Sequence, residues 1–379
     1  MTISPMPGAS FTIPASVLHE AAEFASRATP ARSPVPMLLG LLLTVSDEGL
    51  TLSGFDLERC ATVTVDAVVR KPGRLLVPGR LLTDVAKVAG KADLQVEMSG
   101  GGPVTIQAPG ARWSLPSLPL DEYPQLPEQG EPVGSVNAGD LRMAVRRIIA
   151  AAGRDSTLPM LTGIHLEGNP KSLTLTATDR WRMATTVIPW TPTVDTFEML
   201  VPAELLNVAV KAPAGDHEEL SLTTAGGHMF GVASPTCSIT GRILDVEFVQ
   251  WRRVIDSAAP SGRNTSVVTA DMLRAIAQVS TTSTDRTDQL TLDVTESQVQ
   301  VTVTGDDRSS AVEVAADTEG DDIRIGFNAR YLRDALDSVA SERVTLHFGA
   351  SNTRPALAMG DDPDAYRHLV MPVRIPDAA

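Results

Sequence analysis

Apolar residues recur along this chain in two patterns that alternate with each other. Between residues 141 and 149 they fall at positions 141, 145, 148 and 149, which is the spacing of one buried helix face. Between residues 173 and 177 every second residue is apolar, as in a half-buried strand. The pattern predicts short helices among antiparallel strands. It contains no run of about 18 apolar residues, so it predicts no membrane-spanning helix.

One strand-and-turn sequence occurs more than once. LTLSGFD at 50–56 returns as LTLTATD at 173–179, 123 residues later, and a fainter third copy occupies 301–307. A second marker steps by 124 and then 126 residues, and its three copies are Val77–Leu82, Val201–Leu206 and Phe327–Leu332. Two independent markers in one register indicate three repeated units, each of roughly 125 residues.

Every repeat is expected to have the same internal order. A helix comes first, alternating strands follow, a second helix opens at the Pro or Asn of the second marker, and more strands close the unit. About eight strands and two helices per repeat predict an α+β fold of three domains, with helices on one side of antiparallel sheet. The Gly- and Pro-rich runs 127–135 and 257–266 are predicted to be linkers, which places the domains at 1–128, 129–256 and 257–379.

Charge is divided unevenly between the predicted helices and the rest of the chain. The chain carries −14, yet the six predicted helical segments sum to +4 and leave −18 on the other residues. Arg80 and Lys87 share one helix face, as do Arg142 and Arg146. Basic helix faces on an acidic protein favour weak, sequence-independent contact with nucleic-acid phosphates. Aromatic residues make up only 4% of the chain, which disfavours single-strand binding by base stacking.

Cysteine content and the N-terminal segment bear on the compartment. Cys60 and Cys237 are the only cysteines, too few for a disulfide framework or a zinc site. The N-terminal segment lacks the basic start and apolar stretch of a secretory signal. We therefore expect a cytoplasmic protein with no metal, no cofactor and no membrane partner.

The motifs of common enzyme sites are missing. GxxxxGK[ST], GxSxG, HExxH and CxxC do not occur in the sequence. Asp216–Glu219 and Asp361–Asp364 offer clustered carboxylates, but each stands among turn residues and is predicted to be a solvated loop. His165 lies in an alternating strand and is predicted to be a satisfied structural histidine. These observations favour a non-catalytic protein.

Six motifs occur in order over essentially the whole chain: RSPVPML (32–38), LTLSGFD (50–56), LPSLPLDEYP (115–124), RDSTLPMLTG (154–163), ATDRWRMA (177–184) and MPVR (371–374). Together with the threefold repeat they resemble the beta subunit of bacterial DNA polymerase III, the sliding clamp, in an actinobacterial form. The resemblance implies three DNA-clamp domains per chain and a head-to-tail homodimer. That dimer would be a closed ring of six domains around duplex DNA, and closure would leave no free sheet edge.

The family tethers the polymerase III alpha subunit to DNA without preferring a sequence, after a separate clamp loader has placed the ring. The implied DNA contacts come from the lining helices and the rim loops. They are Arg32, Arg80, Lys87, Arg142, Arg146, Arg147 and Arg154. The resemblance implies no cofactor and no catalytic residue.

The resemblance also implies a pocket for a short peptide carried by the alpha subunit, the clamp loader and other proteins with a clamp-binding motif. An apolar groove that contains Met suits recognition of several peptides. The matching positions are Leu161, Thr178, Trp181, Arg182 and Met183 in the second domain, Val249, Arg253 and Val254 near the linker, and Tyr331, Leu369, Met371, Pro372, Val373 and Arg374 in the third domain and tail.

The sequence departs from the family pattern at this pocket. FVQW at 248–251 replaces Phe-Pro-x-Tyr, Asp256 replaces a common proline, Trp181 replaces a smaller ring, and the chain continues past Arg374. Two hypotheses stay open: the ordinary replication clamp, and a specialised copy that confers antibiotic resistance by tolerating a clamp-binding inhibitor. A third hypothesis, from another class, is a three-domain scaffold or adhesin that does not bind DNA. It predicts a monomer, whereas a clamp is a dimer.

Overall fold

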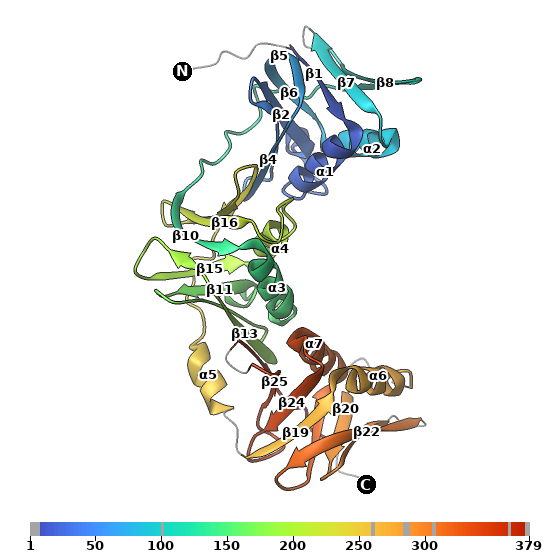
Figure 1. Cartoon of the computed structure of the whole chain (residues 1–379), viewed down its shortest axis with the longest axis vertical. Coiled ribbons are helices and arrows are strands. Elements are labelled where there is room, and N and C mark those ends of the chain that lie inside the picture. The colour runs from blue at the N-terminus through green and yellow to red at the C-terminus, as the bar shows by residue number, and fades with distance from the viewer. Residues whose placement is uncertain are drawn as a thin grey trace. The chain divides into compact units, whose positions relative to one another are not determined.

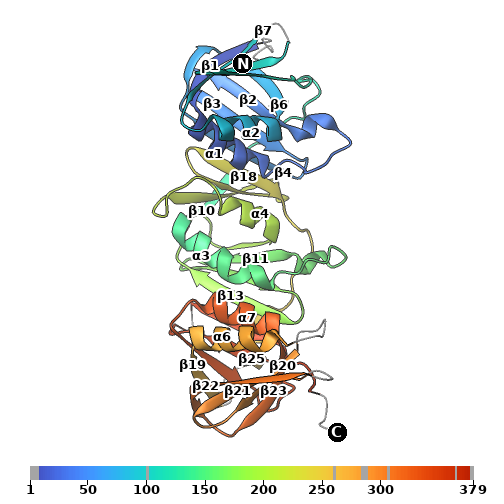
Figure 2. The same cartoon turned by 90° about the vertical axis from the view of Figure 1, so that its right-hand side faces the viewer.

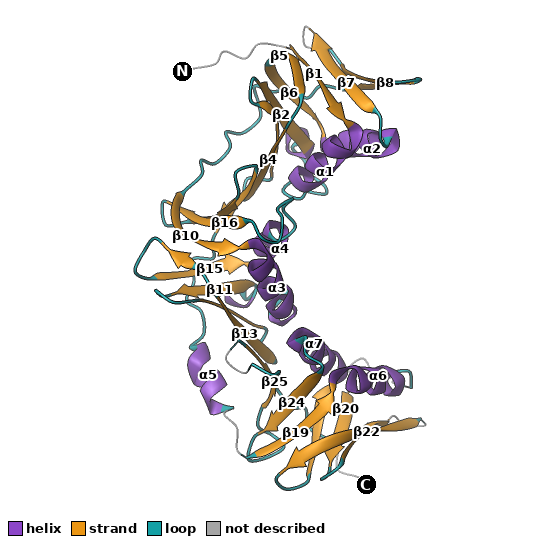
Figure 3. Ribbon diagram, in the orientation of Figure 1, coloured by secondary structure: helices purple, strands orange, loops and turns teal. Residues whose placement is uncertain are grey.

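The computed structural model describes residues 8–99, 102–258, 262–282, 289–304, 308–362 and 365–375. Antiparallel strands predominate, with helices between them (Figure 1, Figure 3). The chain divides into two compact units. The first comprises Met1–Asp140, Thr191–Val194 and Glu204–Ile243, and the second comprises Leu141–Trp190, Asp195–Ala203 and Leu244–Ala379. No helix in the described part of the chain is long and apolar enough to cross a membrane.

The first unit contains two antiparallel sheets. One has the strand order β5-β1-β7-β8-β9 and the other β14-β10-β16-β17-β18-β4-β3-β2-β6. Their strands are β1 (Gly8–Pro14), β2 (Gly40–Ser46), β3 (Gly49–Phe55), β4 (Arg59–Val65), β5 (Val68–Lys71), β6 (Gly73–Pro78), β7 (Asp93–Ser99), β8 (Val104–Ala108), β9 (Ala111–Leu115), β10 (Glu131–Asn137), β14 (Thr191–Pro192), β16 (Glu219–Ala225), β17 (Met229–Ala233) and β18 (Cys237–Arg242).

The second unit contains one sheet of 12 strands, in the order β15-β11-β12-β13-β26-β25-β24-β19-β22-β21-β20-β23. Its strands are β11 (Gly163–Gly168), β12 (Leu173–Thr178), β13 (Arg182–Ile188), β15 (Phe197–Pro202), β19 (Arg263–Val268), β20 (Gln289–Val294), β21 (Gln298–Thr304), β22 (Ser309–Glu319), β23 (Ile323–Asn328), β24 (Arg343–Phe348), β25 (Ala356–Met359) and β26 (Tyr366–Val370).

The helices pack in pairs against the sheets. Within the first unit α1 lies beside α2, and within the second α6 lies beside α7 (Figure 2). The predicted stripe of α3 is largely observed: Leu141, Val145 and Ile148 are buried, whereas Ile149 lies past the helix end in a 3-10 turn. The α-helices of the described residues are α1 (Ala15–Ser26), α2 (Gly79–Ala89), α3 (Ala138–Ile148), α4 (Ala203–Ala209), α5 (Trp251–Ser257), α6 (Thr269–Ser280) and α7 (Ala329–Val339).

The repeated sequence forms the same turn twice. Asp56 accepts hydrogen bonds from the backbone and the guanidinium of Arg59, and Asp179 does the same for Arg182. The residue after each aspartate has a positive φ, 77° at Leu57 and 81° at Arg180. Side chains rarely adopt this conformation, so its presence at both equivalent positions makes the turn a property of the repeat. The third copy ends at 305–307, outside the described residues.

Within each unit the same strand pairing joins sheet from successive repeats. In the first unit β4 pairs with β18, with Ala61 opposite Ile239. In the second unit β13 pairs with β26, with Ala184 opposite His368. β4 and β13 begin 123 residues apart, so they are equivalent strands of the first and second repeats. Each pairs with the last strand of the following repeat, which is β18 for β4 and β26 for β13.

Both predicted linkers are partly wrong. The run 127–135 ends inside β10, and the run 257–266 ends inside β19. Their Gly and Pro residues suggested loop, but the strands that follow start within the runs because adjacent edges supply pairing partners. Residues 259–261 of the second run lie outside the described part.

Candidate functional site

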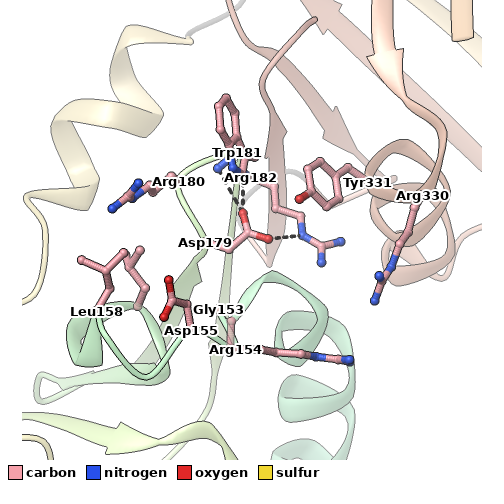
Figure 4. A pocket seen from close by; sticks show the side chains of 12 residues that line it. Gly153, Arg154, Asp155, Leu158, Asp179, Arg180, Trp181, Arg182, Arg330 and Tyr331 are labelled. Atoms are coloured by element: carbon pink, nitrogen blue, oxygen red, sulfur yellow. Dashed lines mark hydrogen bonds and ion pairs between the residues drawn. The ribbon is translucent and has the colours of Figure 1, made fainter. Parts of the chain in front are cut away.

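A buried arginine organises the turn that follows β12. Arg182 is 5% exposed, and its Nε donates to Asp179 Oδ2 at 2.9 Å. Its Nη1 donates to Asp334 Oδ2 of α7 at 2.7 Å, and the guanidinium lies 4.5 Å from the centroid of the Tyr331 ring (Figure 4). A desolvated guanidinium needs this set of partners, because an unpaired buried charge costs several kcal/mol, roughly 3–5.

A cavity of about 300 Å³ opens beside this turn. Four of the predicted pocket residues line it, namely Leu161, Trp181, Arg182 and Tyr331. The Trp181 side chain is 54% exposed and directly follows Arg180, whose φ is positive (Figure 4). The cavity therefore combines an apolar floor, an exposed indole and a fixed positive charge.

Other predicted pocket residues lie beneath the surface. Met183 and Leu369 are 3% and 2% exposed and belong to an apolar cluster with Ile255. Val249 and Met371 pack against that cluster and are only partly buried. Thr178 is buried, and its hydroxyl donates to the Arg182 carbonyl at 2.7 Å. These residues are not among the lining of the cavity.

The tail is held by backbone hydrogen bonds. Met371 N donates to the Trp181 carbonyl at 2.7 Å, and Val373 N donates to the Gly326 carbonyl at 2.9 Å. A Cβ on Gly326 would lie 2.9 Å from Val373 O, so only glycine admits this approach. Pro372 and Arg374 follow the same path, and Gln289 Nε2 donates to the Arg374 carbonyl at 2.8 Å. The tail thus connects the Trp181 turn to the sheet of the third repeat.

The segment around α5 borders a second hollow of about 340 Å³. Val249 and Arg253 line it, whereas Val254 is 37% exposed and is not among its lining residues. Arg252 donates to both carboxylate oxygens of Glu167, at 2.8 and 2.6 Å. The hydrogen bond from Arg252 lowers the pKa of Glu167, although partial burial opposes it. This ion pair fastens α5 to β11.

His165, predicted to be a satisfied structural histidine, is satisfied at one nitrogen only. Its Nε2 pairs with Glu198 at 2.9 Å, and its ring stacks on Phe248 at 4.9 Å. Its Nδ1 is buried and has no partner within the described residues. The cluster Asp216–Glu219 begins in the predicted turn after α4 and ends at Glu219, the first residue of β16, while Asp361–Asp364 falls partly outside the described residues.

The predicted DNA-contacting residues differ in accessibility. Arg32, Arg80, Lys87 and Arg146 are exposed, and Arg142 is half-buried. Arg147 packs its guanidinium over Tyr366, 5.6 Å from the ring centroid, with its Nε buried. Arg154 is exposed but lines the cavity beside Trp181. Arg32, Arg80, Lys87 and Arg146 are open to solvent, whereas the Arg147 guanidinium packs on Tyr366 and Arg154 lines the cavity.

Sequence reasoning missed several cavity residues, namely Asp155, Leu158, Asp179, Arg180, Arg330 and, as the partner of Arg182, Asp334. Arg180 and Asp179 lie in the repeated turn, so the repeat could have indicated them. Asp334 carries no such signal, since it stands 152 residues from Arg182 and meets it only through the fold.

A buried polar chain lies behind the cavity. The Tyr366 hydroxyl donates to the Arg147 carbonyl at 3.1 Å and lies 2.7 Å from His368 Nδ1, which therefore carries the proton and donates to it. His368 Nε2 is buried with no partner among the described residues. Burial, with a smaller contribution from the nearby Arg182 charge, lowers the pKa of His368 to about 3.

Acid should therefore destabilise the second unit through His368. The unfolded imidazole binds a proton below its ordinary pKa, about 6.5, while the folded one stays neutral until about 3. Stability present above pH 6.5 is lost as pH falls through that window, by about 1.4 kcal/mol per unit. Urea unfolding from pH 7 to 5 should show this slope in the wild type and a shallower one in His368→Gln. Equal slopes would contradict the prediction.

Comparison with known proteins decides the family. Models of the DNA polymerase III beta subunit match residues 9–127 as its N-terminal domain, 135–250 as its central domain and 259–374 as its C-terminal domain. The chain belongs to this family. The chain is 35% identical to the beta sliding clamp of Streptomyces coelicolor over 373 residues, covering 95% of this chain and 97% of that protein. The predicted clamp function is thereby confirmed.

Two further relatives extend the comparison. A beta sliding clamp homolog, GriR, of Streptomyces muensis is 32% identical over 373 residues, or 96% of this chain and 99% of that one. The crystal structure of the beta subunit from Thermotoga maritima superposes with a TM-score of 0.88 at 22% identity, covering 97% and 100% of the two chains. The predicted fold, three clamp domains of helices on antiparallel sheet, is confirmed.

Proposed function

We propose that this sliding clamp works as a head-to-tail homodimer that encloses duplex DNA and has no catalytic activity of its own. The main evidence for this proposal is a pair of strand edges that lack a pairing partner within the described part of the chain. Within the chain, β18 and β26 close two joints by pairing with β4 and β13. By position in the repeat, β9 is equivalent to β18 and β26, and the first part of β22 is equivalent to β4 and β13. Among the described residues β9 pairs only with β8, and the first part of β22 pairs only with β21, so each has one unpaired edge. Pairing β9 of one chain with β22 of its partner repeats the internal joint.

The free edge of β9 has its donors in the right place. β8 and β9 are joined by the two-residue turn Pro109–Gly110, with Ala108 opposite Ala111. The pair that closes such a turn exchanges hydrogen bonds, and the ladder then alternates. The N–H groups of Arg112 and Ser114 therefore point away from β8. Two such joints between two chains would give six domains in a ring, with domains ending near residues 128 and 256 in each chain.

The proposed DNA contact is weak and independent of sequence. Arg80 and Lys87 lie exposed on one face of α2, and Arg146 lies exposed on α3. None of the three has a hydrogen bond or an ion pair in the described part of the chain. Isolated cations on helices bridge phosphates without reading bases, and each phosphate contact makes binding more sensitive to salt. A loose grip lets a ring slide.

Reversing charge at Lys87 and Arg146 should lower retention on DNA without altering the dimer. Lys87→Glu with Arg146→Glu removes two phosphate contacts per chain, four in the ring, and adds repulsion, so the slope of log affinity against log salt should fall by up to about 4. Loading onto primed circular DNA and filter binding would measure this. The matched control is Arg324→Glu, an exposed arginine on β23. An unchanged slope, or dependence on DNA sequence, would contradict the proposal.

We further propose that the cavity beside Trp181 docks peptides from the polymerase III alpha subunit, the clamp loader and other proteins with a clamp-binding motif. An apolar floor, one exposed indole and a buried arginine favour a short peptide with large apolar side chains. A related clamp, from Caulobacter crescentus, was crystallised with a polyethylene glycol bound at its putative beta-motif tethering region. Its 23% identity to this chain supports the fold alone.

A specialised, inhibitor-tolerant copy stays the second candidate. The similarity to the GriR clamp homolog and the exposed Trp181 favour it. The clamp of Pseudomonas aeruginosa has been crystallised bound to griselimycin, so clamps can hold such a ligand. Val249 and Asp256, which replace prolines of the family pattern, belong to the segment that borders the second hollow and α5. Complementation of a strain lacking its replication clamp, with and without a clamp-binding inhibitor, separates the two candidates, because only the specialised copy should sustain growth in its presence.

A further inference from the structure

An ion pair between α5 and β11 lies outside the cavity beside Trp181. Arg252 and Glu167 line the second hollow, which shares no lining residue with that cavity, and their two hydrogen bonds measure 2.8 and 2.6 Å. The Arg252 guanidinium also lies 4.3 Å from the centroid of the Trp251 ring, a contact that attracts a cation to an indole. Two parallel N–H···O bonds fix the orientation of both side chains. The pair therefore sets where the start of α5 lies on β11.

The other polar groups on this side of α5 are poorly paired. His165 stacks on Phe248, but its Nδ1 is buried and has no hydrogen bond among the described residues. The same is true of Trp251 Nε1. The pKa of Glu167 is lowered first by its hydrogen bond with Arg252, and the Trp251 indole is the smallest influence on it. Because unpaired buried groups are destabilising, the ion pair is the main polar contact that holds α5 here.

The opposite side of α5 packs behind the Trp181 turn. Ile255 belongs to the apolar cluster that contains Met183 and Leu369. Met183 stands two residues after Trp181. Leu369 stands two residues before Met371, whose N–H donates to the Trp181 carbonyl at 2.7 Å. A close-packed interior has few voids to absorb a displacement, so it transmits one. A shift of α5 on β11 therefore reaches the backbone that holds Trp181.

We propose that Glu167 and Arg252 are positioning residues for partner binding: their ion pair fixes α5 and thereby holds the Trp181 turn in the form that binds a peptide. Neither residue lines the cavity, so neither contacts the peptide there. The inference rests on the proposed role of that cavity as the partner site. It distinguishes this pair from an ordinary surface ion pair, whose loss lowers stability slightly and leaves peptide affinity unchanged.

The test measures binding of a labelled synthetic peptide, made of leucines and one phenylalanine, to the full-length protein by fluorescence anisotropy. Glu167→Gln and Arg252→Gln each remove one charge and should weaken binding by about threefold to fivefold, the upper range for a partly exposed pair. The double variant should bind no more weakly than either single one, because both changes remove the same contact. The exchanged pair, Glu167→Arg with Arg252→Glu, should recover most of the affinity.

The matched control is the ion pair of Asp293 and Arg324, which joins β20 to β23 in the same unit. Its carboxylate and guanidinium side chains are 33% and 61% exposed, against 29% and 58% for Glu167 and Arg252. Asp293→Asn should therefore lower stability by a similar amount and leave peptide binding unchanged. A peptide affinity that falls as much in Asp293→Asn as in Glu167→Gln overturns the inference.

Hydrogen exchange over residues 249–257 follows α5 directly. These amides should exchange faster in Glu167→Gln than in the wild type. Faster exchange with unchanged peptide affinity, or weaker binding with unchanged exchange, overturns the inference. Circular dichroism shows whether each variant is folded, and if the exchanged pair does not fold, the two single variants and their double decide. A wild type that binds no peptide contradicts the proposed partner site instead.

Discussion

Ser114→Pro should convert the dimer into a monomer of 40.2 kDa, half the mass expected of the wild type in sedimentation. Proline lacks the N–H that Ser114 presents at the free edge of β9, and its ring obstructs a strand approaching that edge. The pairing with β8 should survive, because Ser114 lies at a position that does not donate to β8. Loss of this N–H leaves a backbone carbonyl of the partner strand without a hydrogen bond, which costs about 1–3 kcal/mol. The clash of the proline ring with the partner strand adds to this cost.

The matched control is Ser114→Ala, which keeps the donor and should stay dimeric at micromolar concentration. The circular dichroism spectra of both variants should equal that of the wild type, which would show that the fold is kept. A dimeric Ser114→Pro would show that β9 is not at the joint. A monomeric wild type would remove the ring altogether and favour the scaffold hypothesis.

Arg182→Ala should destabilise the second unit by about 3–5 kcal/mol, because Asp179 loses its guanidinium partner in a nearly closed site and Asp334 keeps only the looser contacts of Arg330 and Arg333, at 4.0 and 3.9 Å. Peptide binding should be lost with it, since the Trp181 turn depends on the same contacts. Urea unfolding followed by tryptophan fluorescence reports on this unit, which holds Trp181, Trp190 and Trp251. If the slope of the unfolding free energy against urea concentration is unchanged, the substitution alters stability and not the surface exposed on unfolding.

The sequence repeat provides an internal control. Arg59→Ala changes the equivalent arginine of the first repeat, which is 24% exposed and pairs with Asp56 and, at 3.7 Å, with the exposed Glu204. Because the Arg59 side chain is itself partly open to solvent, which screens its charge, the loss should be about 1 kcal/mol. Equal losses at Arg59 and Arg182 would mean that burial of the second arginine has no energetic consequence.

The sequence predicted the elements whose determinants are local. Helices α2, α4 and α7 begin at Gly79, Ala203 and Ala329, directly after the Pro or Asn of the second marker. Asn328 caps α7 by accepting a hydrogen bond from Tyr331 N at 3.1 Å. The repeated turns also followed from the sequence, because identical residues at identical spacing impose the same backbone.

The site was only partly predictable, for a different reason. The family resemblance assigned Arg147 to DNA contact, and its guanidinium packs on Tyr366, 219 residues away in the sequence. Met183 and Leu369 were predicted as pocket residues and are core. Helical periodicity shows which residues share a face of one helix. Whether that face is covered by other residues depends on segments far away in the sequence. The Gly- and Pro-rich runs failed likewise, since strand formation there depends on edges supplied from elsewhere in the chain.

The repeated edge pairing has a consequence for how a ring would open. The β13–β26 joint is formed by two parts of one polypeptide, so covalent connection gives it an effective concentration that dilution cannot change, of millimolar order for short tethers. The same pairing between two chains has no such connection and depends on protein concentration. With similar chemistry at every joint, the intermolecular ones are the first to separate. A clamp loader that opens the ring would therefore separate β9 of one chain from β22 of the other. The strand pairs within each chain would stay intact during opening.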